Sequence, residues 1–307
     1  MDRVGGQLTR TGGPRDASGA ARSTTGGVPA SRRALWYGLP VPALLVVGAS
    51  FLVPVGVLLH LSLTEPTTGL DNYFSALGDQ TTRTILFRTV RMAVLVTLLC
   101  LLVAYPYAYT MTVCRRWVRV LMIAVVLMPF WTSLMARTFA WVVLLGDTGP
   151  INRLLGLFGV GPVSILGTTT AVTIGTAQVL LPFLVLPLYA NLKGIDRRLV
   201  QAAVGLGARP VVAFLRVYLP LSVPGILAGS SVVFVLALGF YVTPALLGSP
   251  RQWMVSQLIA SRVQNLLQFG MGGALAVLVL VLTLGLLALT ARAARSSVAA
   301  ASAGREP

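Results

Sequence analysis

The chain has 307 residues, of which 56% are hydrophobic and only 10% are charged. A soluble domain normally carries about a quarter charged residues, so this composition excludes a soluble globular protein. It predicts an integral membrane protein that crosses the lipid bilayer more than once. The formal net charge is +16, but the basic residues lie between apolar segments, as topology signals do, so we expect no nucleic acid partner.

Residues 1–33 are rich in Gly, Ser, Thr and Arg and show no apolar periodicity, so we expect a disordered, basic cytoplasmic tail. The apolar run that begins at Leu35 is too long for the core of a cleaved signal peptide and has no clear cleavage site. We therefore interpret this run as a permanent first span.

Six segments are apolar over the roughly 20 residues that a helix needs to cross a bilayer. They are Leu35–Leu61, Met92–Met111, Val118–Leu145, Ala171–Leu192, Val223–Leu247 and Gly270–Ala291. They predict an all-α, six-span domain over residues 34–295, followed by a C-terminal tail over residues 296–307. The stretch Trp253–Phe269 has roughly helical apolar spacing and predicts a short helix at the outer surface.

The distribution of basic residues predicts the orientation of these spans. Of the 24 basic residues, 17 lie in residues 1–33, 115–119, 193–216 and 292–305, which alternate with the other loops. The positive-inside rule therefore predicts that both termini are cytoplasmic. Four of the eight acids then lie outside, namely Glu65, Asp71, Asp79 and Asp147.

The cytoplasmic loop over residues 196–221 predicts two short helices joined by a sharp turn. Asp196 is a suitable N-cap, and Gly207 suits the left-handed position that ends many helices. Pro210 fits the first turn of a following helix. Ala202 and Ala203 keep the first helix thin, so another protein surface could approach it closely. We interpret the helix pair as a docking element.

This loop resembles the EAA loop of ABC importer permeases, whose pattern is E-A-A, three residues, G, nine residues, then I-x-L-P. Here the pattern reads Gln201-Ala202-Ala203, Gly207 and Val217-Tyr218-Leu219-Pro220, with every spacing kept. Val217 stands in place of the Ile, and Gln201 stands in place of the Glu. The second change puts in doubt a charged contact with the ATPase subunit.

The segments Pro129–Leu155, Leu181–Asp196 and Phe240–Met254 look like the spermidine/putrescine branch of these permeases, in particular its B-type subunit. The resemblance implies a type I (MetI-like) importer fold that moves spermidine or putrescine inward from an extracytoplasmic solute-binding protein. Related branches carry ferric iron, thiosulfate or sulfate, and opine-type solutes. The implied partners are a cytoplasmic ABC ATPase dimer, which uses ATP and Mg, and a second permease of the C type.

The sequence shows no catalytic constellation, so we expect a transport subunit that is not an enzyme and binds no cofactor or metal. His60 is the only histidine, and it lies in the first span, where a structural role and a functional one remain open. The glycine-rich stretches at 146–149 and 159–162 are not followed by a P-loop lysine, so we interpret them as turns.

Aromatic faces and carboxylates are the groups that bind polyamines, because a ring face attracts a cation. The candidate translocation path therefore comprises Phe130, Trp131, Trp141, Asp147, Phe240 and Tyr241. Aromatic residues near span ends also act as interface anchors, and Asp147 could simply be solvated. Arg137 lies inside the third span, where either a structural ion pair or a substrate contact could explain it.

Two other classes of protein also fit a six-span chain. One is a channel or secondary carrier that does not use ATP, in which the loop over residues 196–221 is only a connector. The other is a membrane scaffold whose basic tail binds anionic lipid. The six spans contain no carboxylate, which disfavours a proton-coupled carrier.

Overall fold

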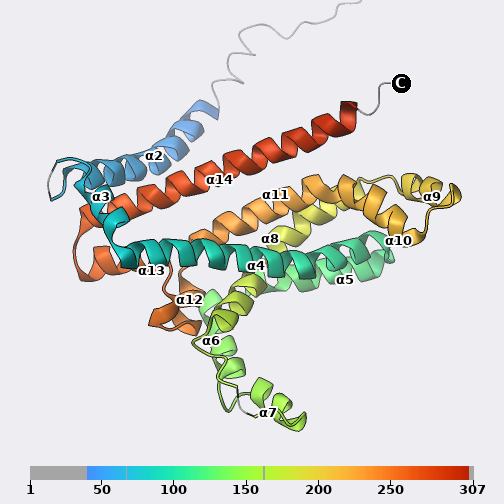
Figure 1. The fold of residues 1–307 in the computed structure, drawn as a ribbon, viewed down its shortest axis with the longest axis horizontal. Coiled ribbons are helices and arrows are strands. Elements are labelled where there is room, and N and C mark those ends of the chain that lie inside the picture. Colours follow the sequence, from blue (N-terminus) through green and yellow to red (C-terminus); the bar gives the residue numbers. More distant parts are fainter. Residues whose placement is uncertain (1–39, 67, 162, 304–307) are drawn as a thin grey trace, which may run out of the picture. The chain divides into compact units, whose positions relative to one another are not determined.

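The computed structural model describes residues 40–66, 68–161 and 163–303, and these contain helices and connecting segments but no strand (Figure 1). The all-α fold is thereby confirmed. The expected tail over residues 1–33 lies outside the described residues. The chain divides into two units, residues 1–53 and residues 54–307, and α2 (Pro40–Thr64) begins in the first and ends in the second.

Five described helices are long and apolar enough to cross a membrane. They are Pro42–Thr64 within α2, α4 (Gln80–Val113), α8 (Thr169–Lys193), the segment Pro210–Leu238, and Phe269–Thr290 within α14 (Phe269–Ala303). A sixth candidate is a bent pair, in which Arg116–Trp131 and Leu134–Leu157 meet at 100°. Counting this pair as one span gives the six spans that the sequence predicts.

The prediction of one continuous third span over residues 118–145 is wrong. The chain forms α5 (Arg116–Leu127), the 3-10 turn η1 (Met128–Trp131) and then α6 (Leu134–Leu145), which leads into α7 (Pro150–Leu157). Pro129 lies at the break, where it removes a backbone donor and clashes with the preceding helical turn. Pro129 also accepts a hydrogen bond from the backbone of Thr132, which closes η1 at 3.3 Å.

The second span begins 12 residues earlier than predicted, at Gln80 instead of Met92. Asp79 caps this helix: its carboxylate accepts hydrogen bonds from the hydroxyl and backbone N–H of Thr82 and from the backbone N–H of Thr81. These bonds stabilise the charged form, and so they lower the pKa of Asp79 below its ordinary value. The apolar pattern missed this part of α4 because it carries three arginines.

The predicted bounds of the fifth span are also wrong. The helical segment starts at Pro210, as α10 (Pro210–Ala213), the π-helical turn η2 (Phe214–Tyr218) and α11 (Leu219–Leu238). It ends at Leu238, and the predicted C-terminal part forms a separate short helix, α12 (Val242–Leu247). The chain therefore contains a second break, at residues 239–241.

The centre of the second unit is formed by α4, α8 and α11, which pack against one another (Figure 1). On α11, Gly225 and Gly229 are four residues apart, the spacing of small residues that lets membrane helices approach closely. A Cβ added to Gly229 would lie 3.1 Å from the carbonyl oxygen of Leu184 on α8. A Cβ added to Gly225 would lie 2.6 Å from the Cβ of Asn191. These glycines set the separation of α8 and α11.

The remaining elements pack at the ends of this core. Near the start of α4 lie α3 (Asp71–Gly78), η3 (Pro250–Gln252), α13 (Val255–Ala260) and η4 (Ser261–Asn265). The short helix predicted within 253–269 is confirmed as α13, but its Val255 and Leu258 are buried against α3, α4 and α14, so it is part of the bundle rather than a helix lying on its surface. At the other end of α4 lies α9 (Arg197–Gly205).

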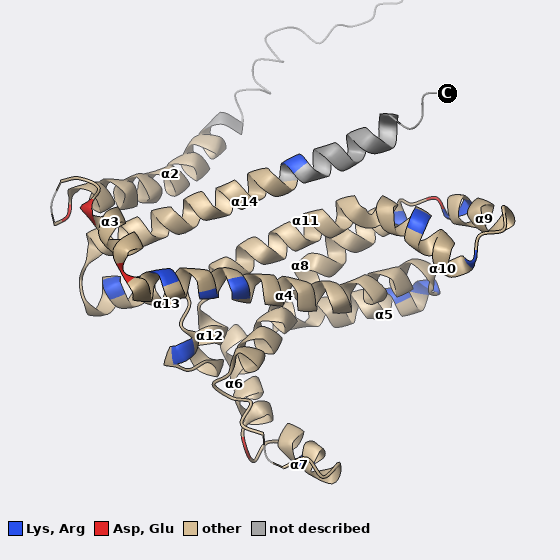
Figure 2. Cartoon of the chain, in the orientation of Figure 1, with Lys and Arg blue, Asp and Glu red and all other residues tan. Residues whose placement is uncertain are grey.

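Most charged residues of the described helices lie at one or the other of these two ends (Figure 2). Around α9 and the adjoining helix ends lie eight basic residues and one acid, Asp196: Arg115, Arg116, Arg119, Lys193, Arg197, Arg198, Arg209 and Arg216. The opposite end holds Arg83, Arg88, Arg91, Arg251 and Arg262, together with Glu65, Asp71 and Asp79, while Asp147 and Arg153 lie in the separate α6–α7 region. The larger number of basic residues around α9 favours a cytoplasmic location for that end.

Candidate functional site

The loop between the fourth and fifth spans has the local structure that its sequence predicts. The carboxylate of Asp196 accepts a hydrogen bond from the backbone N–H of Arg198 at 2.9 Å and caps α9. Gly207 follows the helix with φ of +91°, and the backbone N–H groups of Gly207 and Ala208 donate to the carbonyls of Val204 and Ala203. This pair of bonds defines a Schellman motif, which requires a left-handed residue. Pro210 then occupies the first turn of α10.

The helix pair presents its motif residues and several apolar side chains to the outside. Gln201, Ala202 and Gly207 are exposed, and Ala203 is half-buried. Two apolar side chains of the pair are conspicuous, because Leu206 is 90% exposed and Val211 is 67% exposed. Apolar side chains that cluster on a surface with polar neighbours mark an interaction site. The α9–α10 pair is therefore suited to contact a partner protein.

One arginine attaches this pair to the end of α4, and another attaches α5 to the same end. Arg197, in the first turn of α9, donates from one guanidinium nitrogen to the backbone carbonyl and the hydroxyl of Thr112 on α4. Arg119, on α5, donates to the carbonyls of Met111 at 2.8 Å and Cys114 at 3.2 Å. The last carbonyls of a helix lack partners within it, and cations near that end are favourable. In the sequence, both arginines are recognisable only as topology signals.

The second half of the EAA-like motif lies in an unusual helical turn. Val217 belongs to the π-helical turn η2, whereas Leu219 and Pro220 begin α11. Pro220 has no N–H for the carbonyl of Arg216 four residues before it, and its ring would crowd that carbonyl in a regular α-helix. The wider π turn removes this conflict. Single π turns inside α-helices occur frequently at functional sites.

An aromatic cluster fastens the π turn to α4. Phe214 and Tyr218, from η2, stack on each other with ring centroids 5.5 Å apart. Tyr109 of α4 meets both rings edge-on, at 5.8 Å from Phe214 and 5.4 Å from Tyr218. Tyr105, one turn earlier on α4, meets Phe214 at 6.1 Å, and its hydroxyl lies 3.2 Å from that of Ser222 on α11. A displacement of α9 and α10 would therefore act directly on α4.

Four of the six candidate path residues lie at the two breaks in the spans. Phe130 and Trp131 belong to η1, and Trp131 is 78% exposed. Phe130 meets Phe183 of α8 edge-on at 5.4 Å. Phe240 and Tyr241 lie between α11 and α12, where the carbonyl of Phe240 accepts a hydrogen bond from the hydroxyl of Ser256. Tyr241 is exposed, while Phe240 packs against the central core.

The segments that follow the two breaks pack against each other. The hydroxyls of Thr138 on α6 and Thr243 on α12 are buried and 3.5 Å apart. Arg137, next to Thr138, donates to the carbonyl of Thr132 inside the first break at 3.4 Å. Its Nε is buried and has no partner among the described residues. Among the described residues, the guanidinium of Arg137 therefore has one hydrogen-bond partner, the carbonyl of Thr132 in the first break.

The structure separates Trp141 and Asp147 from the breaks. Trp141 packs against a buried cluster that includes Leu145, Val172 and Leu247, so part of its ring serves as core. Asp147 is exposed in the turn between α6 and α7, beside a cavity of about 340 Å³ that Arg153 also lines. The nearby arginine offsets the attraction that this carboxylate exerts on a cation. The glycine-rich stretch at 146–149 is a turn, as predicted.

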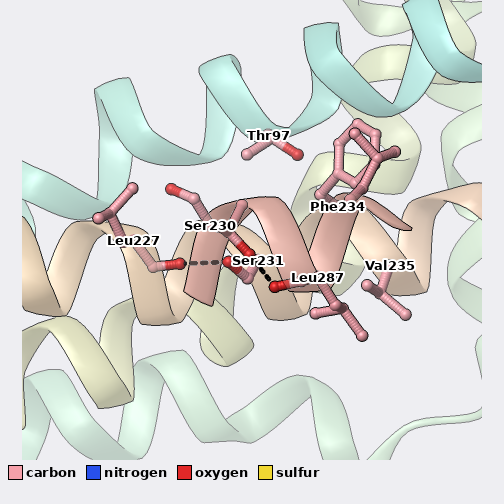
Figure 3. A pocket seen from close by; sticks show the side chains of 9 residues that line it. Thr97, Leu227, Ser230, Ser231, Phe234, Val235 and Leu287 are labelled. Carbon is pink, nitrogen blue, oxygen red and sulfur yellow. Dashed lines mark hydrogen bonds between the residues drawn. The ribbon is translucent and has the colours of Figure 1, made fainter. Parts of the chain in front are cut away.

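A further cavity, of about 240 Å³, lies between α4, α11 and α14 (Figure 3). Its hydroxyl groups come from Thr97, Ser230, Ser231 and Thr290, and its other side chains are apolar. The hydroxyl of Ser231 donates to the carbonyl of Leu227 at 2.6 Å, whereas that of Ser230 is buried without a partner among the described residues. No charged residue lines this cavity. It therefore lacks the groups that a polycation needs.

The described residues contain no group of three or more His, Cys, Asp or Glu side chains that could hold a metal ion. The Nδ1 of His60 lies 3.3 Å from the hydroxyl of Thr64, one turn along α2. Cys100 is buried and its thiol donates to the carbonyl of Ala177 on α8 at 3.4 Å, while Cys114 is half-buried. The thiol of Cys114 donates to the carbonyl of Met111 at 3.7 Å, so His60 and both cysteines have structural partners.

Comparisons with known proteins extend this description. The profile of the family described as "Binding-protein-dependent transport system inner membrane component" matches residues 101–294, more than half of the chain. The spermidine/putrescine transport system permease protein PotB of Escherichia coli (strain K12) is 33% identical over 251 residues, which cover 81% of this chain and 89% of the relative. PotB of Haemophilus influenzae is 37% identical over 226 residues, 72% of this chain and 76% of the relative.

A solved structure shares the fold at lower sequence identity. It is the crystal structure of a bacterial alginate ABC transporter in complex with an alginate pentasaccharide-bound periplasmic protein. One of its chains aligns with a TM-score of 0.69 and 18% identity, covering 85% of this chain and 93% of that chain. The two chains are therefore similar in fold.

Proposed function

Because the chain belongs to the family of binding-protein-dependent transport system inner membrane components, we propose that it carries spermidine and putrescine into the cell. It is a multi-pass membrane protein and a permease subunit of an ATP-binding-cassette importer. We place it in the inner (plasma) membrane with both termini in the cytoplasm. Such an importer works with an ATPase and a solute-binding protein.

The α9–α10 pair is proposed to receive the motion of a cytoplasmic ATPase dimer. The observation that carries this assignment is the combination of an exposed apolar surface with a firm attachment to the core. Leu206 and Val211 offer apolar surface to a partner, while Arg197 and the aromatic cluster join the same helices to α4. A closing ATPase pair would therefore move α4 with the loop and alternate the access of the pathway. ATP and Mg are used by the ATPase.

The polyamine assignment rests on the two PotB relatives and on the groups that the broken spans expose. Trp131 and Tyr241 present aromatic faces at the two breaks, and a cation–π contact is worth about 0.5–2 kcal/mol. Three carboxylates, those of Glu65, Asp71 and Asp79, lie at the end opposite α9 and attract cations toward it. A second, C-type permease is proposed to form the other half of the pathway, and an extracytoplasmic binding protein to deliver the solute.

Uptake by the complete transporter in proteoliposomes tests this function. Labelled putrescine or spermidine, with the binding protein and ATP, should accumulate, whereas ferric iron, thiosulfate, sulfate and opines should not. Accumulation of one of those solutes instead, with none of polyamine, would refute the substrate assignment. Accumulation without ATP would favour a channel or secondary carrier.

Variants of the exposed rings test the pathway itself. Trp131→Ala and Tyr241→Ala should each reduce polyamine uptake about 2- to 30-fold, the range that the loss of one cation–π contact allows. Trp117→Ala is the matched control, because Trp117 is exposed on α5 away from both breaks. ATPase binding should stay unchanged in all three variants. An equal loss of uptake in the control would show that the rings at the breaks have no special role.

A further inference from the structure

One face of α4 combines unpartnered arginines with exposed leucines, in a regular order. At intervals of four and three residues, this stripe consists of Thr84, Arg88, Arg91, Leu95, Leu98 and Leu102. Residues at this spacing lie on one side of a helix. Figure 2 shows the basic positions of α4 gathered toward the end away from α9. The polar half of the stripe therefore adjoins one membrane surface, and the apolar half runs inward.

The polar half of the stripe is concave. Arg88 and Arg91 line a cavity of about 280 Å³ together with Arg251 from η3. Its other lining residues are Thr84, Phe87, Thr169 and Gln252, so it contains no carboxylate. Within the described residues, no hydrogen bond or ion pair joins these three guanidinium groups to another side chain. Arginine forks match the paired oxygens of phosphate and carboxylate, so the cavity suits an anion.

The position of the cavity along α4 identifies the anion. After Arg91, the 22 residues Met92–Val113 contain no charge and span about 33 Å, close to the roughly 30 Å of a bilayer core. Arg91 therefore marks the boundary of the hydrocarbon, the level at which lipid phosphates lie. Phe87, exposed beside the arginines, and Trp253, close by on the same rim, are aromatic residues of the kind found at that level.

The apolar half of the stripe matches the other part of a lipid. Leu98 is 57% exposed and Leu102 is 73% exposed, so the chain itself leaves this surface uncovered. From Arg91 to Leu102 is about 16 Å along the helix, close to half the thickness of the hydrocarbon core. We propose that this face binds one anionic phospholipid of the leaflet opposite α9. Its phosphate would lie among Arg88, Arg91 and Arg251, and an acyl chain along the leucines.

Co-purification of lipid with the full chain tests this proposal. The protein is placed in nanodiscs of phosphatidylglycerol and phosphatidylethanolamine, extracted gently, and its retained lipids are measured by mass spectrometry. The native chain should be enriched in phosphatidylglycerol. The double variant Arg88→Gln/Arg91→Gln should reduce that enrichment about tenfold, because each basic residue near the membrane surface contributes to the attraction of anionic lipid. The matched control, Arg83→Gln/Arg153→Gln, removes two exposed charges outside the stripe and should retain it.

A second pair of variants tests the acyl-chain track. Leu98→Ser/Leu102→Ser should also reduce the enrichment, while Leu121→Ser/Val125→Ser, which changes two exposed apolar residues of α5, should not. Thermal unfolding verifies that all variants remain folded. Equal phosphatidylglycerol enrichment in Arg88→Gln/Arg91→Gln and in its control, Arg83→Gln/Arg153→Gln, overturns the proposal.

Two other occupants give distinct results. Displacement of lipid by soluble glycerophosphoglycerol, with no effect of the leucine pair, would assign the cavity to a free phosphate compound and overturn the lipid. Enrichment that disappears when both permease subunits are assembled would assign the face to the second subunit. Phosphatidylglycerol enrichment that is retained in the assembled transporter supports the proposal.

Discussion

Replacing Gly207 with alanine should weaken the binding of the ATPase without disturbing the spans. Gly207 has φ of +91°, whereas the space around its missing side chain is open, with no atom within 4 Å of an added Cβ. The only cost of a small side chain is therefore the backbone conformation, about 1–2 kcal/mol for an L-residue in the left-handed region. That energy reduces the population of the Schellman turn and re-aims α9 relative to α10.

The expected size of the effect follows from this energy. If the ATPase binds only the conformation with the intact turn, a cost of 1–2 kcal/mol raises its dissociation constant by at most about 5- to 30-fold. Gly207→Asn should have a smaller effect than Gly207→Ala, because asparagine adopts the left-handed region more readily. Gly205→Ala is the matched control, since Gly205 also has open space around it but lies within α9 with ordinary φ. It should be neutral or slightly stabilising.

The assay measures ATPase binding to the purified permease in nanodiscs by surface-based or fluorescence titration, together with ATP-dependent uptake. Membrane insertion and thermal unfolding of the spans should be the same for all four proteins. The order of affinity should be native and Gly205→Ala, then Gly207→Asn, then Gly207→Ala. If Gly207→Ala binds and transports normally, or if Gly205→Ala loses as much affinity, the turn is not a coupling element.

Three further predictions concern topology, helix packing and pH. In a chain without its native cysteines, a cysteine introduced at Thr148 should react with an impermeant reagent in intact cells. A cysteine introduced at Arg116 should react only after the cells are permeabilised. Equal reaction of the two in intact cells contradicts the proposed orientation. Gly229→Leu should prevent the close approach of α8 and α11, at a cost of about 1–3 kcal/mol, and lower the midpoint of thermal unfolding, while Gly285→Leu, at a glycine with open space, should not. Because the fold lowers the pKa of Asp79, its stabilising effect is present above the unfolded pKa of about 4 and is lost as pH falls through the folded value. The native chain should therefore unfold at a higher temperature than Asp79→Ala at pH 7, and the difference should shrink toward pH 3; a difference that is independent of pH contradicts this linkage.

Local rules applied to the sequence were sufficient for several features of this protein. Hydrophobic composition requires membrane helices, and windows of about 20 apolar residues locate most of them. Asp196, Gly207 and Pro210 determine their own turn, because a cap, a left-handed residue and a first-turn proline each act through neighbours within a few positions. The spacing from Gln201 to Pro220 indicated the importer permease family for the same reason: it lies within one continuous segment.

Tertiary structure alone decided which helices continue and what they contact. The apolar pattern predicts Pro129 inside one span and another span that continues through residues 239–241, yet both helices break there. Prolines inside α8 and α11, in contrast, do not end those helices. Whether a proline breaks a membrane helix depends on neighbours that satisfy the freed backbone groups. Arg197 contacts Thr112, 85 positions away, and Gly229 meets α8 only because α11 packs there. Such contacts join residues that are distant in the chain, so their roles emerge only when the helices are packed together.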